Sequence, residues 1–280
     1  MKYRTEVRHG LSLGAVLLSL AAWATFAAEP STPAATAPTA TSPAPEGASS
    51  MSAKADGGAS PAADDAHEIV ALEADGKPFH AFERTARHVP TAHGAVLIIP
   101  DFSRATAPSH DLINALREAP AAGGWETLAI ELPIVPLTAS AAAVTEAASA
   151  LCPRLTASLA HIAGRKLTRT VVVGVGASFD YAMACFKDKL PADIVGVAGV
   201  GAWQHEIKDL KLPIFDVVPT LDPHATRLAD IRRQAALTVS PSVYRQASID
   251  GVDRWFIGAE VEVAKRLRGW LTQLPRTTKS

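Results

Sequence analysis

The chain has 280 residues, of which 48% are hydrophobic, so it can bury a sizeable core in one large domain or two small ones. Its formal net charge of −1 gives no electrostatic attraction to nucleic acid, and nucleic-acid partners are therefore not expected. The same charge balance does not favour binding to a membrane surface.

The N-terminus has the pattern of an export signal. Lys2 and Arg4 precede an apolar run from Leu11 to Ala22, and the small residues Thr25 and Ala27 stand at positions −3 and −1 of the cleavage site that we expect after Ala27. The run is shorter than the roughly 20 residues that a membrane span needs, so no span is expected after cleavage. We therefore predict a signal peptide over residues 1–27 and a periplasmic or secreted mature protein.

The next segment, residues 28–65, is nearly all Ala, Pro, Ser, Thr and Gly and has no apolar periodicity. Such a segment cannot bury enough surface to offset the entropy lost on ordering. We predict a disordered spacer here, followed by a single folded domain over residues 66–275.

Within this domain, short apolar runs alternate with helical periodicity. Asp75-Gly76 is a hairpin signal between the first two strands. The expected strands are Glu68–Leu72, Pro78–Arg84, Ala95–Pro100, Trp125–Leu132, Val171–Val173, Asp193–Val200, Ile214–Val218 and Ser242–Ile249. Two antiparallel strands followed by alternating strands and helices predict an α/β fold with a doubly wound, mostly parallel sheet, and nothing marks an inserted cap domain.

The helices are predicted from caps and apolar spacing. The expected helices are Ser109–Arg117 with Ser109 as its cap, Ala141–Ala163 with a kink or restart at Pro153, one directly after Ser178, one opening at Asp222-Pro223, and Glu260–Leu274. For the helix after Asp222, we assign Leu228, Ile231 and Ala235 to the buried apolar face.

Five small residues, Gly174-Val175-Gly176-Ala177-Ser178, join the triple-valine strand to the helix after it. This is the layout of a nucleophile elbow, in which a sharp turn between a strand and a helix presents a reactive side chain. The nucleophile position is occupied by Gly176, which has no side chain. We expect the Ser178 hydroxyl to cap the helix by accepting a backbone N–H.

The order of elements, the turn GVGAS and the segment GVDRWF resemble the α/β-hydrolase superfamily. The segments GWETL (124–128), YRQ (244–246) and GWL (269–271) are similar to an exported bacterial domain-of-unknown-function family of hydrolase-like proteins. The resemblance covers about residues 66–274 and implies an α/β-hydrolase-like fold without a cap domain. A shared fold does not by itself imply an activity.

The resemblance implies a catalytic triad in the chain order Ser, Asp or Glu, then His, and this chain departs from it. The nucleophile position is Gly176. Asp222 stands at the acid position, although an Asp before Pro223 is also what helix capping selects. Arg254 stands at the base position and stays protonated near pH 7, so it cannot relay a proton. We expect Arg254 to bind an anion or to pair with Asp222.

The loop that should supply the oxyanion hole reads Asp101-Phe102-Ser103-Arg104. It lacks the glycines that let backbone N–H groups point at a substrate oxygen. A carboxylate at Asp101 would also oppose a developing negative charge. The loop therefore gives a second reason to expect that the ordinary hydrolase chemistry is missing.

Two functions remain open. The first is a non-catalytic protein of the cell envelope that binds or scaffolds, with an envelope protein or a small molecule as its partner. The second is a serine esterase or hydrolase with a displaced nucleophile and a histidine base. Its candidate residues are Asp101, Ser103, His110, His205, Asp222 and His224.

Cofactors are not expected. The candidate side chains lack the tight local spacing of metal ligands. A dinucleotide fingerprint starting at Gly174 fails because Phe179 stands where its third glycine should be.

The two cysteines, Cys152 and Cys185, fall on helices that we expect to pack on the same face of the sheet. Export would expose them to an oxidising compartment. The sequence leaves both a disulfide and two buried free thiols open, because the distance between the two Cα atoms cannot be derived from it.

Overall fold

The structure, a computed structural model, describes residues 68–103, 110–136, 138–187, 189–207, 211–239 and 244–275. The expected signal peptide (1–27) and spacer (28–65) lie outside these residues. The strands are β1 (Glu68–Ala74), β2 (Lys77–Arg84), β3 (Ala95–Ile99), β4 (Glu126–Ile130), β5 (Thr170–Val175), β6 (Ile194–Val200), β7 (Ile214–Pro219) and β8 (Tyr244–Ile249). The helices are α1 (Asp111–Ala122), α2 (Ala141–Ser149), α3 (Leu151–Gly164), α4 (Ser178–Cys185), α5 (Pro223–Val239) and α6 (Glu260–Leu271).

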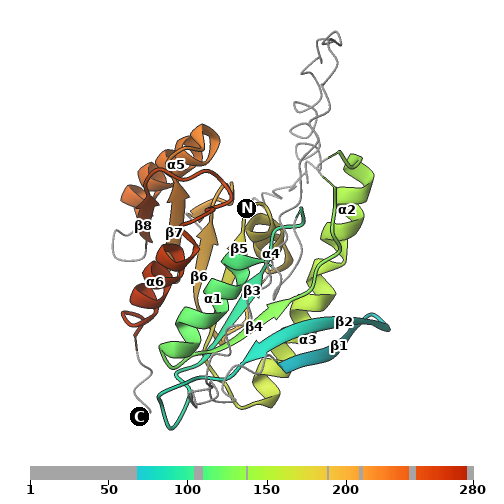
Figure 1. Cartoon of the computed structure of the whole chain (residues 1–280). Coiled ribbons are helices and arrows are strands. Elements are labelled where there is room, and N and C mark those ends of the chain that lie inside the picture. Colours follow the sequence, from blue (N-terminus) through green and yellow to red (C-terminus); the bar gives the residue numbers. More distant parts are fainter. Residues whose placement is uncertain are drawn as a thin grey trace, which may run out of the picture. The chain divides into compact units, whose positions relative to one another are not determined.

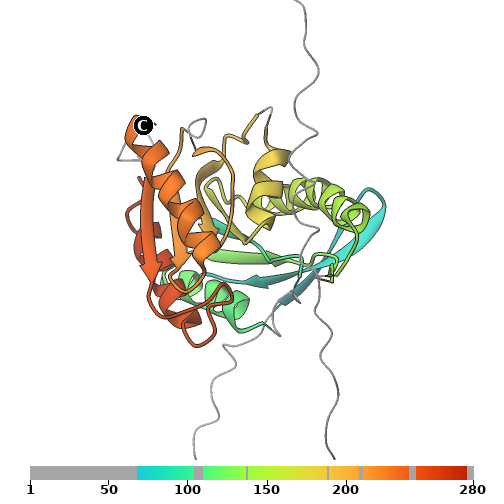
Figure 2. The same cartoon turned by 90° about the horizontal axis from the view of Figure 1, so that it is seen from above.

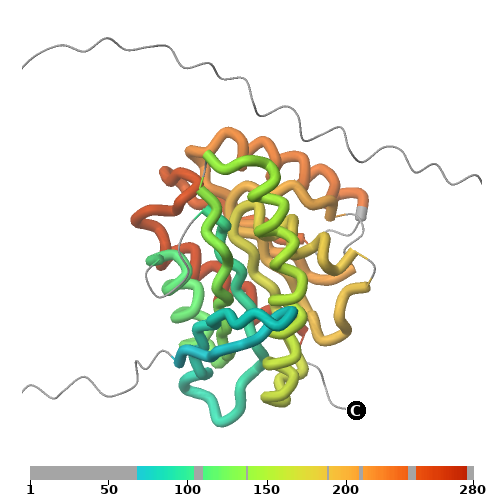
Figure 3. Tube along the Cα trace, turned by 90° about the vertical axis from the view of Figure 1, so that its right-hand side faces the viewer, coloured from blue at the N-terminus to red at the C-terminus, as the bar shows by residue number. Residues whose placement is uncertain are grey.

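The strands form one eight-stranded sheet in the order β1-β2-β4-β3-β5-β6-β7-β8 (Figure 1). β2 runs antiparallel to β1 and β4, and the remaining pairs are parallel. This confirms the doubly wound, mostly parallel sheet predicted from the sequence. The first turn is also as predicted, because Asp75 (φ 50°) and Gly76 (φ 73°) both adopt the left-handed conformation of a two-residue hairpin turn. The hairpin lies beside α3 (Figure 3).

Two helical layers cover the sheet (Figure 2). Helices α2, α3, α4 and α5 contribute to the apolar core on one face, and α1 and α6 contribute to the core on the other. In β5, Val172 belongs to the first core while Val171 and Val173 belong to the second, so a strand buried on both faces reads as a continuous apolar run. None of the described helices is long and apolar enough to cross a membrane.

Several helix boundaries differ from the sequence prediction, among them the end of α1 at Ala122 and the end of α6 at Leu271. Helix α1 begins at Asp111 after His110, whose side chain makes no capping hydrogen bond, and the expected cap Ser109 lies outside the described residues. The expected helix over residues 141–163 breaks at Ala150 into α2 and α3. Pro153 then stands in the first turn of α3, where its missing N–H removes no intrahelical hydrogen bond.

The predicted apolar face of α5 is only partly buried, since Ala235 packs against the core while Ile231 does not. The residues of α5 that the sheet covers are Ala225, Ala229, Arg232 and Ala236, and Ile231 is 59% exposed. The helix is therefore rotated relative to the prediction, because the buried carboxylate of Asp216 in β7 binds the Arg232 guanidinium and draws that side chain inward. The apolar stripe of Leu228, Ile231 and Ala235 is left beside the core instead of within it.

A disulfide joins Cys152 of α3 to Cys185 of α4, with the Cα atoms 5.3 Å apart. This settles the alternative that the sequence left open. The bond closes a loop with a sequence separation of 33 residues, for which loss of chain entropy in the unfolded state predicts a stabilisation of about 3–4 kcal/mol. It fixes the helix that follows the Gly176 turn.

Candidate functional site

The turn between β5 and α4 keeps the backbone shape of a nucleophile elbow. Gly176 has φ +58°, and its N–H donates to the Val200 carbonyl at 2.8 Å. This left-handed conformation is costly for residues with a Cβ and is what the sharp reversal from strand to helix requires. The predicted strand–turn–helix is therefore present, with glycine at its apex.

The carboxylate of Asp101 lies over the apex of this turn. β3 pairs with β5 so that Ile99 stands opposite Gly174, which brings the segment after β3 alongside the turn. A Cβ atom added to Gly176 would lie under 3.0 Å from Asp101 Oδ2, closer than real Cβ contacts. The space in which a nucleophilic side chain would begin is thus filled by a carboxylate.

The Asp101 carboxylate is held by the loop that follows it. Its Oδ1 accepts the backbone N–H of Ser103 at 2.8 Å and also the Ser103 hydroxyl proton. A hydroxyl has one proton to donate, and that of Ser103 goes to Asp101. The loop therefore presents negative charge to the turn at the place where an oxyanion hole would present N–H donors.

The Ser178 hydroxyl is fully buried and is used in another way than predicted. It donates its one proton to the Val175 carbonyl oxygen (2.7 Å), with the Ile99 carbonyl oxygen also in range at 3.1 Å, and no capping bond to the start of α4 is found. The capping prediction is wrong because Ser178 is the first residue of α4 and Ala177 is the cap position, so the hydroxyl bonds back to carbonyls at the ends of β5 and β3. Ser178 ties the two strands to the turn.

Asp222 and Arg254 meet at the ends of β7 and β8. Asp222 is 4% exposed, and its Oδ1 accepts the N–H groups of His224 (3.0 Å) and Ala225 (3.2 Å), which is the predicted helix cap. Its Oδ2 lies 3.4 Å from Nε of Arg254, whose side chain is 59% exposed. The two residues that the resemblance assigns to the acid and base positions therefore form an ion pair, and its guanidinium cannot accept a proton as an imidazole would.

The three candidate histidines come from three different connections. His110 precedes α1, His205 lies between β6 and β7, and His224 is in the first turn of α5. The structure brings Asp101, Ser103 and Gly176 together as one group and Asp222 with Arg254 as another. Among the described residues, no three His, Cys, Asp or Glu side chains gather as a metal ion would require.

Sequence reasoning missed Asp180, which holds the loop after β6. Its carboxylate accepts the backbone N–H groups of Gln204 (2.8 and 3.0 Å) and His205 (2.6 Å). Burial raises the pKa of Asp180 to about 6, against the lowering effect of the two amides and of the Arg232 guanidinium. An acidic residue in the first turn of a helix is common because it interacts favourably with the helix dipole. The sequence therefore gives no signal that Asp180 binds the backbone of a distant loop.

The raised pKa of Asp180 predicts that the free energy of unfolding depends on pH. Its ordinary pKa of 3.8 rises to about 6 in the folded state, so the folded protein binds more protons between these values. The free energy of unfolding should therefore fall as the pH rises from about 4 to about 6, by up to about 3 kcal/mol from this group. We expect Asp180→Asn, which keeps an acceptor oxygen, to remove that contribution in urea unfolding at pH 4 to 7. Asp230→Asn, at an exposed carboxylate, should leave it unchanged, and equal slopes in all three proteins would contradict the assignment.

Sequence reasoning also missed a fully buried charge on β7. Asp216 accepts hydrogen bonds from Arg232 Nη2 (2.7 Å) and Nε (3.0 Å), from the Trp203 indole (3.0 Å), from the Tyr244 hydroxyl and from the Gln246 amide (3.2 Å). The Arg232 guanidinium lies 3.9 Å from the centre of a Trp203 ring and also donates to the Trp203 carbonyl. The signal was a lone acid in the apolar run IFDVVP, which requires a buried partner.

Solved structures with the same fold include several hydrolases. The esterase domain of a Rhodothermus marinus protein is 11% identical, with a TM-score of 0.58 over 75% of this chain and 99% of that one. Dienelactone hydrolase from Anabaena variabilis is 15% identical, with a TM-score of 0.58 over 75% and 99%. A serine hydrolase without a lid from Xanthomonas campestris is 12% identical, with a TM-score of 0.56 over 76% and 97%. At these identities the likeness shows the α/β-hydrolase fold alone.

Comparison with the sequences of curated proteins finds no match. Residues 11–157, more than half of the chain, match the family described as "Protein of unknown function (DUF3530)". This agrees with the resemblance to a family of unassigned function that the sequence motifs indicated. The chain belongs to the DUF3530 family and has an α/β-hydrolase-like fold.

Proposed function

We propose that the protein is a non-catalytic, exported member of the α/β-hydrolase fold that acts in the cell envelope by binding. The observation that carries this proposal is the Asp101 carboxylate, which lies over Gly176 so closely that a Cβ there would have to displace its Oδ2 atom. A nucleophile is thus missing from the sequence, and the space for one is occupied as well.

The base position supports the same conclusion. Arg254 is paired with Asp222, so the group that would accept and return a proton is a permanent cation held by the former acid. Ester hydrolysis by a serine- or cysteine-type triad needs a hydroxyl or thiol beside an imidazole. Both requirements fail at the positions where the fold places them.

Export is supported by two features. The basic and apolar N-terminal pattern is that of a signal peptide, and the Cys152–Cys185 disulfide suits an oxidising compartment. The periplasm or the exterior of the cell is therefore the compartment that we propose.

The alternative, an esterase with a displaced nucleophile, has one observation in its favour. Ser103 lies in the loop beside the turn and its hydroxyl is hydrogen-bonded to a carboxylate. That carboxylate is negatively charged next to the position where an oxyanion would form, so it would oppose the transition state of ester hydrolysis. We therefore favour binding over hydrolysis.

The test is turnover of short acyl esters by the purified mature protein and by Ser103→Ala. We expect both proteins to hydrolyse p-nitrophenyl acetate and butyrate at the rate of the buffer control. Saturable turnover by the native protein that the Ser103→Ala substitution abolishes would refute the proposal and establish the displaced esterase.

A further inference from the structure

The connection between β6 and β7 differs from the other crossovers between parallel strands. Each of the others carries at least one α-helix, whereas the described residues of this one, 201–207 and 211–213, carry none. Helices α4 and α5 cover the same face of the sheet on either side of it. The flank of α5 that a helix would otherwise cover faces a loop.

That flank of α5 is apolar. Leu228, Ile231 and Ala235 have the spacing i, i+3 and i+7 and therefore form one stripe along the helix. Ile231 is 59% exposed, and the sheet-facing side of α5 is made by other residues. Leu228 and Ala235 are partly buried, so the stripe is open to solvent mainly at Ile231.

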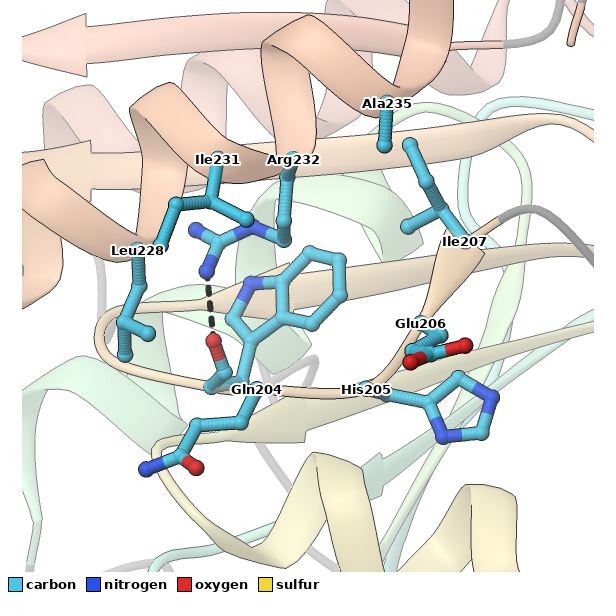
Figure 4. Close-up of a pocket in the computed structure, with 9 residues that line it drawn as sticks. Gln204, His205, Glu206, Ile207, Leu228, Ile231, Arg232 and Ala235 are labelled. Atoms are coloured by element: carbon cyan, nitrogen blue, oxygen red, sulfur yellow. Dashed lines mark hydrogen bonds between the residues drawn. The ribbon is translucent and has the colours of Figure 1, made fainter. Parts of the chain in front are cut away.

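The stripe and the loop enclose a groove of about 220 Å³ (Figure 4). One wall is α5, with Leu228, Ile231, Arg232 and Ala235, and the other is the loop from Gln204 to Ile207. An engineered apolar cavity of about 150 Å³ accepts benzene, so this volume suits one ring with a small substituent. None of the residues at the Gly176 turn lines the groove, which makes it a separate site.

The cation in the α5 wall of the groove does not favour an anionic ligand. Arg232 is 3% exposed, and its three nitrogens are engaged by the Asp216 carboxylate and the Trp203 carbonyl, so it offers little to a ligand carboxylate. The Gln204 amide, on the opposite wall, supplies hydrogen-bonding groups to an uncharged polar substituent.

We propose that the groove between α5 and the Gln204–Ile207 loop binds an uncharged, mostly apolar molecule of one ring with a hydrogen-bonding substituent. The ring lies on the stripe of Leu228, Ile231 and Ala235, and the substituent faces the loop. This goes beyond the proposed function, since the groove would bind such a molecule whether or not the Gly176 turn has any chemistry.

The test compares two probes of the same size and different charge, benzyl alcohol and benzoate. We expect saturable binding of benzyl alcohol to the mature protein by ligand-observed NMR titration, and at least 10-fold weaker binding of benzoate. Neither probe carries an ester, so the result is independent of any hydrolytic activity. Absence of saturable benzyl alcohol binding, or equal binding of both probes, would overturn the proposal.

Variants on one helix locate the site. Ala235→Trp fills the groove and should weaken benzyl alcohol binding at least 10-fold, whereas Leu237→Trp, at a position that is 66% exposed and outside the groove, should leave it unchanged. Ile231→Lys places a positive charge at an exposed position, so it should weaken benzyl alcohol binding and strengthen benzoate binding. This variant keeps the test valid if Ala235→Trp does not fold. Binding that none of the groove variants alters would place the probe elsewhere and contradict the proposal.

Discussion

Replacing Arg232 with alanine is expected to lower the free energy of unfolding by about 3–5 kcal/mol in urea denaturation. Asp216 is 0% exposed and has Arg232 as its bidentate ion-pair partner. Without the guanidinium, a carboxylate would remain buried with only neutral donors around it. The same substitution releases the Trp203 carbonyl, so the loop after β6 should lose protection in hydrogen exchange as well.

The adjacent residue gives a matched control. Arg233 also forms an ion pair, with Asp230 at 2.8 Å, but its side chain is 56% exposed. Because water and salt screen such a pair, Arg233→Ala should change the free energy of unfolding by at most about 1 kcal/mol. Similar losses of unfolding free energy for the two arginine variants would show that the stabilisation by the Asp216–Arg232 pair does not come from its burial.

The second large effect is a gain of activity when the turn is rebuilt. Gly176→Ser alone is expected to be inactive, because Asp101 Oδ2 occupies the space that the new side chain needs and Arg254 cannot act as a base. Adding Asp101→Gly and Arg254→His clears that space and supplies an imidazole next to Asp222. We expect the triple variant to hydrolyse p-nitrophenyl acetate at least about 100-fold faster than the native protein, the scale of general-base catalysis.

Asp222→Asn, added to the triple variant, provides the control for this gain. It should remove most of the acquired rate, because the carboxylate orients the imidazole in a serine triad. If Gly176→Ser alone hydrolysed the ester as fast as the triple variant, the blocking role given to Asp101 and Arg254 would be wrong.

Several features followed from local sequence rules. The Asp75-Gly76 turn needs two residues with positive φ, and Asp222 before Pro223 is a cap whose backbone partners are two and three residues away. The turn at Gly176 is predicted from the sequence because five small residues between a strand and a helix are typical of a sharp strand-to-helix turn. In each case the interactions that decide the structure lie within a few residues.

Other features depend on contacts between distant segments, which the sequence does not encode in a local pattern. Asp101 and Gly176 meet because β3 and β5 are neighbours, and the position of the carboxylate depends on the Ser103 turn. The rotation of α5 follows from a charge pair between β7 and the helix, which outweighs the apolar periodicity used to assign its buried face. The groove is visible only once that rotation is known.

The most direct test of the non-catalytic account is the mass of the intact mature protein after exposure to an activated fluorophosphonate. This reagent forms a covalent adduct with a serine that is activated for attack. The account predicts no adduct on the native protein and a single adduct at position 176 in the triple variant. A stoichiometric adduct on the native protein that Ser103→Ala abolishes would contradict it.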